Sequence, residues 1–530
     1  MPRLPPALIR QAAAQHPLLP LLLRVCRDIY SAQNELRWLQ EHARDTVLTK
    51  RRKHDRPPAR SRRVLRSLPQ RHACKGLLVP TSGRTHSDRF CKDGEEQSWE
   101  EKPGSLDEEH PLILDITSRR LSSGVPPWDP VRECEVRGGH SKPIPGQPTE
   151  SALRDTLLGR HTEVAHTRRL LAGYVTRRAR GVPLQYLLGS QPFGNLEILT
   201  RKAVLIPRPE TETYTEHVAR LLLSWLHRAT PSSQTSVGGR KKLRILDLCS
   251  GTGCIALLLH SLLKAPQSKV ASNENMDLEI LGSDISSDAI HLAERNLQHN
   301  IANGLLRTDA AQDISFRQMD ILQSARLNAT EMRALFEKGG SGHDDASGLH
   351  TPWDVIISNP PYISPRDYGP GGKTESSVRK YEPRIALVPP VSGSSLDGNP
   401  ATDPGDVFYG PLMDLIHGLG ARLLLMEVGD SQQAGRVHEM ARRKFGATTS
   451  NADRAVLFEA WQNDGTERLL PAHLPADQGQ GLAIAGDAAR QAAEVTASVD
   501  TGTGTGVSDR AVVIWTGDLA QWRRSARWAA

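Results

Sequence analysis

Short apolar runs of strand length alternate with segments of helical periodicity from about residue 181 to the end of the chain. A chain with this alternation buries a mostly parallel sheet between helices, so a doubly wound α/β domain is predicted. Polar, small-residue stretches interrupt the pattern and are expected to be surface loops. The expected strands are 245–248, 278–281, 355–357 and 423–426, with a closing antiparallel pair at 455–458 and 512–515. The expected helices are 254–263 and 286–300, and the expected loops are 228–240, 264–276, 336–350, 391–406 and 464–508.

Helical spacing of apolar residues appears in two further segments, 6–45 and 151–180, on either side of a long stretch without periodicity. That stretch is first basic, then acidic and then rich in proline and glycine, which is typical of disordered chain. The two helical segments are therefore interpreted as parts of one small domain, split by an insertion. The predicted organisation is a helical segment at 1–45, the disordered insertion at 46–150, the rest of the helical domain at 151–190, a linker with a β-hairpin at 191–240, and the α/β domain, with its insertion at 464–508, over 241–530.

The formal charge of +7 is concentrated in one segment. Residues 50–75 carry eleven Lys or Arg against a single acid, Asp55. Such a run is typical either of a solvated basic linker or of contact with a phosphate-rich partner. Any nucleic-acid contact is therefore expected only through 50–75.

The first 27 residues contain four arginines and no acid, a composition typical of a mitochondrial transit segment or of an ordinary helical start to the domain. No stretch approaches about 18 uninterrupted apolar residues, so no membrane span is predicted. The six cysteines form no CxxC pair, which argues against a disulfide framework or a zinc site and predicts a reducing compartment. A monomer is expected.

A glycine-containing loop follows the first expected strand, at the edge of the sheet where α/β proteins bind their ligands. Glycines there let the backbone turn tightly and approach a ligand that a Cβ atom would block. The pattern alone also satisfies a loose dinucleotide fingerprint, and a tight turn that binds nothing is the other alternative. The residues of this loop expected to contact a cofactor are Cys249, Ser250, Gly251, Thr252 and Gly253.

Two acidic side chains stand at the ends of the next two expected strands. Asp284 can accept hydrogen bonds from both hydroxyls of a ribose. Asp320 can accept one from the amino group of an adenine, while Ile321 packs against the face of the base. Each acid could instead cap the helix that follows it. Three strand-end features in this order favour a nucleoside-containing cofactor.

The expected strand at 355–357 runs through Ser358 into Asn359, Pro360, Pro361 and Tyr362. The two prolines remove backbone donors and stiffen the turn. The Asn359 side-chain oxygen and the Pro360 carbonyl can then accept both N–H groups of an NH2, and Tyr362 can flank a planar group. An amide or arylamine nitrogen is a poor nucleophile, so it needs this orientation to attack an electrophilic methyl group. The turn predicts a methyltransferase that uses S-adenosylmethionine, with Asn359 to Tyr362 as catalytic residues and no metal.

Three further segments resemble the release factor glutamine methyltransferases, the HemK/PrmC family. They are 181–189 together with Phe193, 204–212 and 382–387, whose sequences include Gly-Val-Pro-Leu-Gln-Tyr, Ile-Pro-Arg-Pro-Glu-Thr-Glu and Glu-Pro-Arg-Ile-Ala-Leu. The resemblance covers roughly 151–227, 241–263, 277–335, 351–390 and 407–463, with a final strand at 508–516, and 6–45 is similar to the start of the family's helical domain.

The resemblance implies a Rossmann-like class I methyltransferase fold and, as methyl acceptor, the glutamine side-chain amide in the Gly-Gly-Gln motif of a peptide-chain release factor. It implies that the helical domain contacts that protein. It also implies that Cys249 to Gly253, Asp284, Ile321 and Asn359 contact the cofactor, and that Asn359 to Tyr362 clamp the substrate. The family usually has glycine where this chain has Cys249. The helical domain and the long insertions are similar to a mitochondrial, fungal-type member.

An amino-methyltransferase acting on adenine or guanine of DNA or RNA is the main alternative, because it would share the turn and could use the basic run. It would also need a target-recognition region, and 46–150 shows no pattern of one. A nicotinamide oxidoreductase would leave the proline turn unexplained, and an inactive binding module would not need Asn359. Methylation of a release factor glutamine, in mitochondria or otherwise in the cytoplasm, is therefore the favoured interpretation.

Overall fold

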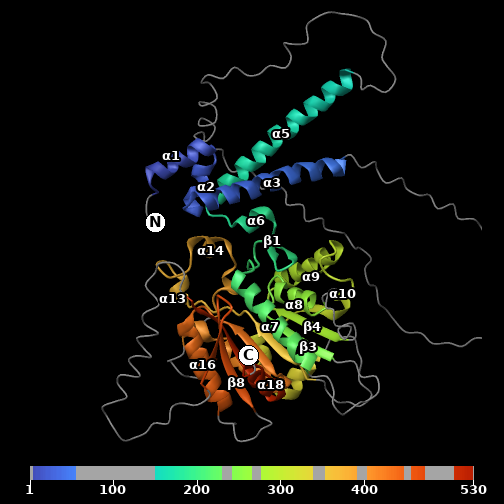
Figure 1. Cartoon of the computed structure of the whole chain (residues 1–530), viewed down its shortest axis with the longest axis vertical. Coiled ribbons are helices and arrows are strands. Elements are labelled where there is room, and N and C mark those ends of the chain that lie inside the picture. Colours follow the sequence, from blue (N-terminus) through green and yellow to red (C-terminus); the bar gives the residue numbers. More distant parts are fainter. Residues whose placement is uncertain are drawn as a thin grey trace, which may run out of the picture. The chain divides into compact units, whose positions relative to one another are not determined.

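The computed structural model describes residues 4–54, 150–228, 242–264, 276–337, 352–390, 403–446, 455–471 and 507–528 (Figure 1). The chain divides into two compact units, one made of 1–50 and 163–530 and the other of 51–162. In the second unit, the described residues are the end of helix α3 (Ile29–His54) and the first turns of helix α5 (Glu150–Ala179). Most of the predicted insertion at 46–150, of the basic run at 50–75 and of the insertion at 464–508 therefore lies outside the described residues.

The N-terminal helices of the first unit pack around one apolar core. Leu22 and Leu39 on the early helices share it with Leu171 and Val175 of α5, which follow more than a hundred residues later. Arg178 of α5 donates two hydrogen bonds to the Glu35 carboxylate, at 2.7 and 2.8 Å. Helix α3 continues to His54, beyond the expected boundary at residue 45, because Thr46 to His54 contain no helix breaker. The helices are α1 (Pro6–Gln15), α2 (Leu19–Cys26), α3, α5 and the short α6 (Leu184–Leu188).

Among the described residues, none of the helices combines the length and the apolar character that crossing a bilayer requires.

A two-stranded hairpin connects the helical segment to the rest of the first unit. Strands β1 (Ser190–Phe193) and β2 (Leu196–Leu199) pair antiparallel, with Phe193 opposite Leu196. Gly194 in the turn has φ 57°, and a Cβ atom there would lie 2.5 Å from Cδ1 of Leu258. The turn therefore requires glycine both for its backbone conformation and for its close approach to α8 (Cys254–Leu263).

The main sheet has eight strands in the order β5-β4-β3-β6-β7-β10-β8-β9. The first five strands in this order are parallel, and the last three are antiparallel to their neighbours. This confirms the predicted, mostly parallel α/β sheet and its closing antiparallel pair. The strands are β3 (Lys242–Leu248), β4 (Asp277–Asp284), β5 (Ile314–Gln318), β6 (Val355–Ser358), β7 (Leu423–Glu427), β8 (Val456–Gln462), β9 (Glu467–Leu470) and β10 (Asp509–Thr516).

Strand β9 differs from the expectation of a surface loop that begins at residue 464. Its residues pair antiparallel with β8, with Leu470 opposite Phe458. The burial of Leu470 in the core explains why so short a segment joins the sheet. Four residues are too few to show an alternating pattern in the sequence.

Helices cover both faces of the sheet, and each face has its own apolar core. One core contains side chains of α7 (Pro209–Arg228), α8 and α18 (Gly517–Trp528), with Leu297 of α9 (Ser287–Ala302). The other contains side chains of α12 (Ala329–Glu337), α15 (Tyr409–Leu419) and α16 (Ser431–Phe445). Shorter helical elements occur in the connecting segments of the chain. They are α10 (Ala310–Asp313), α11 (Ile321–Ser324), α13 (Pro365–Tyr368), α14 (Ser376–Tyr381), and the 3-10 turns η2 (Arg384–Ala386) and η3 (Pro404–Asp406).

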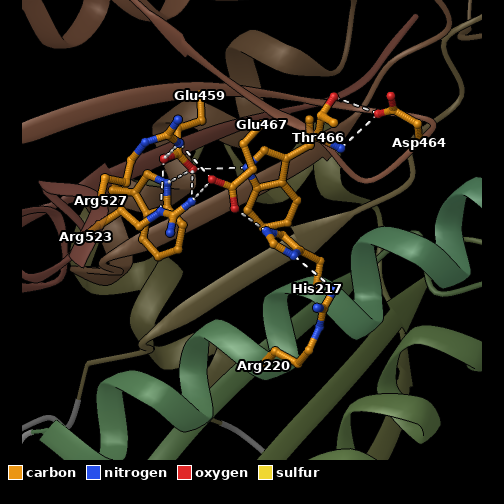
Figure 2. Close-up of polar contacts among 10 residues, drawn as sticks. His217, Arg220, Glu459, Asp464, Thr466, Glu467, Arg523 and Arg527 are labelled. Carbon is orange, nitrogen blue, oxygen red and sulfur yellow. Dashed lines mark hydrogen bonds and ion pairs between the residues drawn. The ribbon is translucent and has the colours of Figure 1, made fainter. Parts of the chain in front are cut away.

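A buried ion-pair network holds the antiparallel end of the sheet (Figure 2). Glu459 of β8 is fully buried and accepts hydrogen bonds from Arg523 at 3.0 Å and Arg527 at 2.7 Å, both on α18. Glu467 of β9 pairs with the same two arginines and with His217 of α7. These bonds join the last strands to α7 and to the C-terminal helix α18, and a buried carboxylate such as Glu459 is tolerated only with partners of this kind.

Candidate active site

A cavity of about 430 Å³ opens at the carboxyl ends of β3, β4 and β6 and next to the loop after β5, as expected for a doubly wound sheet. Nine of the predicted site residues line it, and Gly253, Pro360 and Tyr362 do not. The nine are Cys249, Ser250, Gly251, Thr252, Asp284, Asp320, Ile321, Asn359 and Pro361.

The loop after β3 has the left-handed backbone that its glycines allow. Gly251 has φ 53° and Gly253 has φ 76°, and a Cβ atom on Gly253 would lie 2.8 Å from Cζ of Phe316. The Ser250 amide donates to the Ser283 carbonyl at 2.9 Å, which fixes the loop to β4. Cys249 also has a positive φ, 61°, a conformation that favours glycine. The glycine that the resemblance implies at this position would adopt this conformation without strain, and this chain has a cysteine in it.

Several buried polar atoms around this loop have no hydrogen-bond partner among the described residues. They are Oδ1 of Asp247, Oγ of Ser250 and Oγ of Ser283. The other Asp247 oxygen accepts from the Ala256 amide at 3.1 Å, at the start of α8. Burial raises the pKa of Asp247 to about 7. Of these three residues only Ser250 lines the cavity, so its hydroxyl is available to the polar part of a cofactor.

Asp284 ends β4 with both carboxylate oxygens engaged. One accepts from the Gly251 amide at 2.9 Å, and the other accepts from the Ser286 amide at 2.9 Å. Burial raises the pKa of Asp284, and these backbone hydrogen bonds oppose the shift. Each oxygen of a carboxylate has two lone pairs, so Asp284 can still accept from the hydroxyls of a ribose.

Asp320 caps the N-terminus of α11, which was one of the two roles that its sequence position allowed. Its Oδ1 accepts from the amides of Leu322 at 2.9 Å and Gln323 at 3.3 Å, at the start of α11. Its Oδ2 accepts no hydrogen bond from a described residue. Asp320 and the buried Ile321 both line the cavity, so the adenine position predicted for them stays compatible with the cap.

The turn after β6 is connected by hydrogen bonds to the buried carboxylate of Glu427. Asn359 Nδ2 donates to Oγ1 of Thr211 at 3.2 Å, and Thr211 donates to Oε2 of Glu427 at 2.6 Å. The Tyr362 hydroxyl donates to Oε1 of the same carboxylate at 3.1 Å. Tyr362 therefore points to Glu427, whereas the sequence predicted it as a wall for a planar group. Burial beside Glu427 raises the pKa of the Tyr362 hydroxyl.

A second wall of the cavity comes from two segments that were singled out in the sequence without a defined role. Residues 203–208 and 384–386 both line it. Glu382, which is 6% exposed, accepts from the Ile206 amide at 3.2 Å and from Arg208 at 2.7 Å. Gln191 of β1 donates to the Pro207 carbonyl at 2.8 Å. The buried Glu382 therefore joins the two segments into one wall.

Two residues of the site, Glu427 and Thr211, were not predicted to act there. Glu427 ends β7 as Asp284 ends β4, so the strand-end reasoning applied to the other strands would have found it. Thr211 lies within 204–212, a segment whose sequence indicated only the resemblance to the methyltransferase family. Its contact with Glu427 joins residues 216 positions apart, and a single sequence contains no signal for such a pairing.

Comparison with known proteins gives a consistent set of relatives. The chain is 33% identical over 266 residues to the probable MRF1 mitochondrial N(5)-glutamine methyltransferase of Schizosaccharomyces pombe, covering 48% of this chain and 67% of that protein. It is 33% identical over 215 residues to the release factor glutamine methyltransferase of Chlorobaculum tepidum, covering 40% and 55%. It is 34% identical over 214 residues to the mitochondrial MRF1 N(5)-glutamine methyltransferase of Saccharomyces cerevisiae, covering 40% and 51%.

No family model matches the chain. Among solved structures, the N-terminal domain of human METTL16 in complex with SAH is 12% identical, with a TM-score of 0.29, covering 64% of this chain and 82% of that one.

Proposed function

The chain belongs to the release factor glutamine methyltransferase family, and we propose that it transfers the methyl group of S-adenosylmethionine to the glutamine side-chain amide in the Gly-Gly-Gln motif of a release factor. The observation that carries this proposal is the turn after β6. Its Asn359 lines the cavity beside the strand ends that fit a nucleoside, and its amide oxygen accepts no hydrogen bond from a described residue. That oxygen is available for the N–H of an acceptor amide.

The cavity residues fit the proposed methyl donor. Asp284 would hold the ribose hydroxyls, Asp320 Oδ2 and Ile321 would hold the adenine, and Ser250 offers an unpartnered hydroxyl for the amino acid part. When bound, S-adenosylmethionine supplies an electrophilic methyl group on a positively charged sulfonium. The protein therefore needs no metal or activated nucleophile of its own.

The protein contributes orientation and electrostatic stabilisation. The oxygen of Asn359, which lines the cavity, accepts one N–H group of the glutamine amide. The carbonyl of Pro360, the next residue of the turn, is the proposed acceptor for the other N–H, so that the nitrogen is held toward the methyl group. Positive charge develops on that nitrogen as its new bond forms, and both acceptors stabilise this charge. Fixing the amide in a reactive orientation removes an entropic cost that free glutamine would have. The nitrogen then loses one proton to solvent, which leaves a neutral N-methyl amide.

We further propose that the substrate is a mitochondrial release factor and that the protein acts in mitochondria. The relatives from two yeasts are named as mitochondrial enzymes. The first 27 residues form α1 and α2 and contribute Leu22 to the helical core, so their composition fits an ordinary helical start to the domain and adds no support for this compartment.

The decisive experiment incubates the purified full-length chain with radiolabelled S-adenosylmethionine and a mitochondrial release factor. Label is expected in the release factor, and mass spectrometry of its peptides should place one methyl group on the Gly-Gly-Gln glutamine. A release factor with alanine in place of that glutamine is the matched control and should take no label. Labelling of DNA or RNA instead of the release factor would support the amino-methyltransferase alternative and overturn the proposal.

A further inference from the structure

Glu427 is a buried carboxylate next to the proposed clamp, but it does not line the cavity. It ends β7, is 2% exposed, and accepts hydrogen bonds from Thr211 at 2.6 Å and from Tyr362 at 3.1 Å. Burial raises its pKa, and these hydrogen bonds oppose that shift. Burying a carboxylate is costly, so its presence behind the turn calls for a role.

The hydrogen bond to Glu427 determines which end of the Asn359 amide faces the cavity. Thr211 has one hydroxyl hydrogen, and it is donated to the carboxylate. Toward Asn359, 3.2 Å away, the Thr211 oxygen can therefore only accept, so the Asn359 group that meets it must be the NH2. The oxygen of Asn359 is left on the other side. The chemistry of the three groups thus fixes an amide orientation that atomic positions alone do not distinguish.

We propose that Glu427 and Thr211 are positioning residues, which hold the Asn359 amide with its oxygen toward the acceptor nitrogen and anchor Tyr362 at the other end of the turn. The proposal rests on the function proposed above and adds two residues to it. Without this relay, Asn359 could rotate and present its NH2 to the NH2 of the acceptor. Two donors would then face each other, and the acceptor nitrogen would lose the oxygen that stabilises its charge.

The first test compares two substitutions of Thr211. Thr211→Val keeps the side-chain shape and removes the hydroxyl, whereas Thr211→Ser keeps the hydroxyl. We expect Thr211→Val to lower kcat by about tenfold or more while cofactor affinity stays within about twofold, as loss of an oriented contact does. Thr211→Ser should retain most of kcat. Equal losses in the two variants would overturn the proposal, because they would reflect packing and not the hydroxyl.

Glu427→Gln extends the test to the acid. Thr211 and Tyr362 donate to different oxygens of the carboxylate, and glutamine replaces one of these oxygens with an NH2 donor, so the two hydroxyls cannot both keep their present bonds. We expect kcat to fall by at least as much as in Thr211→Val. Wild-type kcat in Glu427→Gln would overturn the role of the acid. Thermal unfolding and cofactor binding measured in parallel show whether the variant is folded, and Thr211→Val provides the test if it is not.

A double-mutant cycle separates positioning from a general structural effect. If Thr211 acts through Asn359, Thr211→Val should change kcat by less than about threefold in an Asn359→Ala background, although it costs about tenfold alone. Equal effects of Thr211→Val in the two backgrounds would contradict the relay.

An acceptor-free measurement separates failure of this inference from failure of the proposed function. With the asparagine side-chain nitrogen isotopically labelled, the NMR signal missing in Asn359→Ala identifies the Asn359 NH2. That signal should shift in Thr211→Val and remain near its wild-type position in Thr211→Ser. A shift of the same size in both variants would refute the relay. If the signal behaves as expected but the wild type methylates no release factor, the proposed function fails and the relay stands.

Discussion

Asn359 is the residue on which the proposed chemistry depends most directly. Asn359→Ala should leave cofactor affinity within a few-fold and lower kcat by on the order of 10²-fold or more, because it removes an acceptor that acts mainly in the transition state. Steady-state kinetics with labelled cofactor, together with calorimetric binding, give the two numbers. Asn303→Ala, at an exposed position after α9, is the matched control and should behave as wild type. Near-normal turnover of Asn359→Ala would remove the residue from the mechanism.

Asp247 gives a pH-dependent prediction because its pKa, raised by burial to about 7, lies well above the ordinary value of 3.8. The native state therefore keeps a proton between about pH 4 and 7 that the unfolded chain has released, and stability falls as pH rises through that range. Asp247→Asn cannot ionise, so this part of the fall should disappear.

Urea unfolding of the wild type and of Asp247→Asn at two pH values checks this. The free energy of unfolding of the variant, relative to wild type, should be higher at about pH 7.5 than at about pH 5. The same difference at both pH values would show that Asp247 does not titrate in this range.

Side-chain positions at single strand ends were predictable, whereas their hydrogen-bond partners were not. The places of Asp284, Ile321 and Asn359 at the cavity follow from the rule that ligands bind at carboxyl strand ends. The side-chain direction of Tyr362 depends on Glu427, a residue 65 positions away that the turn itself does not specify. Distant partners of this kind arise from the packing of the whole domain.

At the scale of elements, the wall formed by 203–208 and 384–386 depends on the buried carboxylate of Glu382. Glu382→Ala should loosen this wall and weaken cofactor binding by about 1–3 kcal/mol, since the Ile206 amide and Arg208 lose a shared acceptor. Calorimetric titration with the cofactor measures the loss. Glu439→Ala removes the carboxylate that pairs with the exposed Arg443 on α16 and is the matched control, with no expected effect on binding. Equal affinities of the two variants would show that the wall does not need Glu382.

Elements with a mainly apolar run were predicted well, and β9, which has no such run, was not. Strands β3, β4, β6 and β7 and helix α8 all fall where the pattern placed them, because each contains the apolar run from which it was predicted. Strand β9 was missed because it has four residues, three of them at least partly exposed. It belongs to the sheet through its neighbour β8 and the ion pairs of Glu467, which local sequence does not reveal.

At the scale of the whole molecule, the segment between α3 and α5 is predicted to be dispensable for chemistry. The described members of the core that these helices share include Ala32 to Ala43 on one side and Leu171 to Val175 on the other, so both flanking segments contribute to it. Replacing 56–148 with a Gly/Ser linker of about 20 residues should preserve cofactor binding and methylation of an isolated release factor, since loop entropy changes slowly with length.

The wild-type chain and this variant can be compared on free and on ribosome-bound release factor at two salt concentrations. If the basic run at 50–75 contacts RNA, only activity on the ribosome-bound factor should fall, and its salt dependence should weaken. Loss of activity on the free factor at both concentrations would show that the segment is a working part of the enzyme.

The pairing of Arg178 with Glu35 also implies a delay during synthesis of the chain, because the helical core cannot form until α5 has been made. The two residues are 143 positions apart, and at roughly 5–20 residues per second a ribosome needs on the order of 7–30 s to pass from one to the other. During that time the apolar faces of α1, α2 and α3 have been made but their partner α5 has not. The exposure of these faces to chaperones and to other nascent chains is therefore governed by the pace of translation.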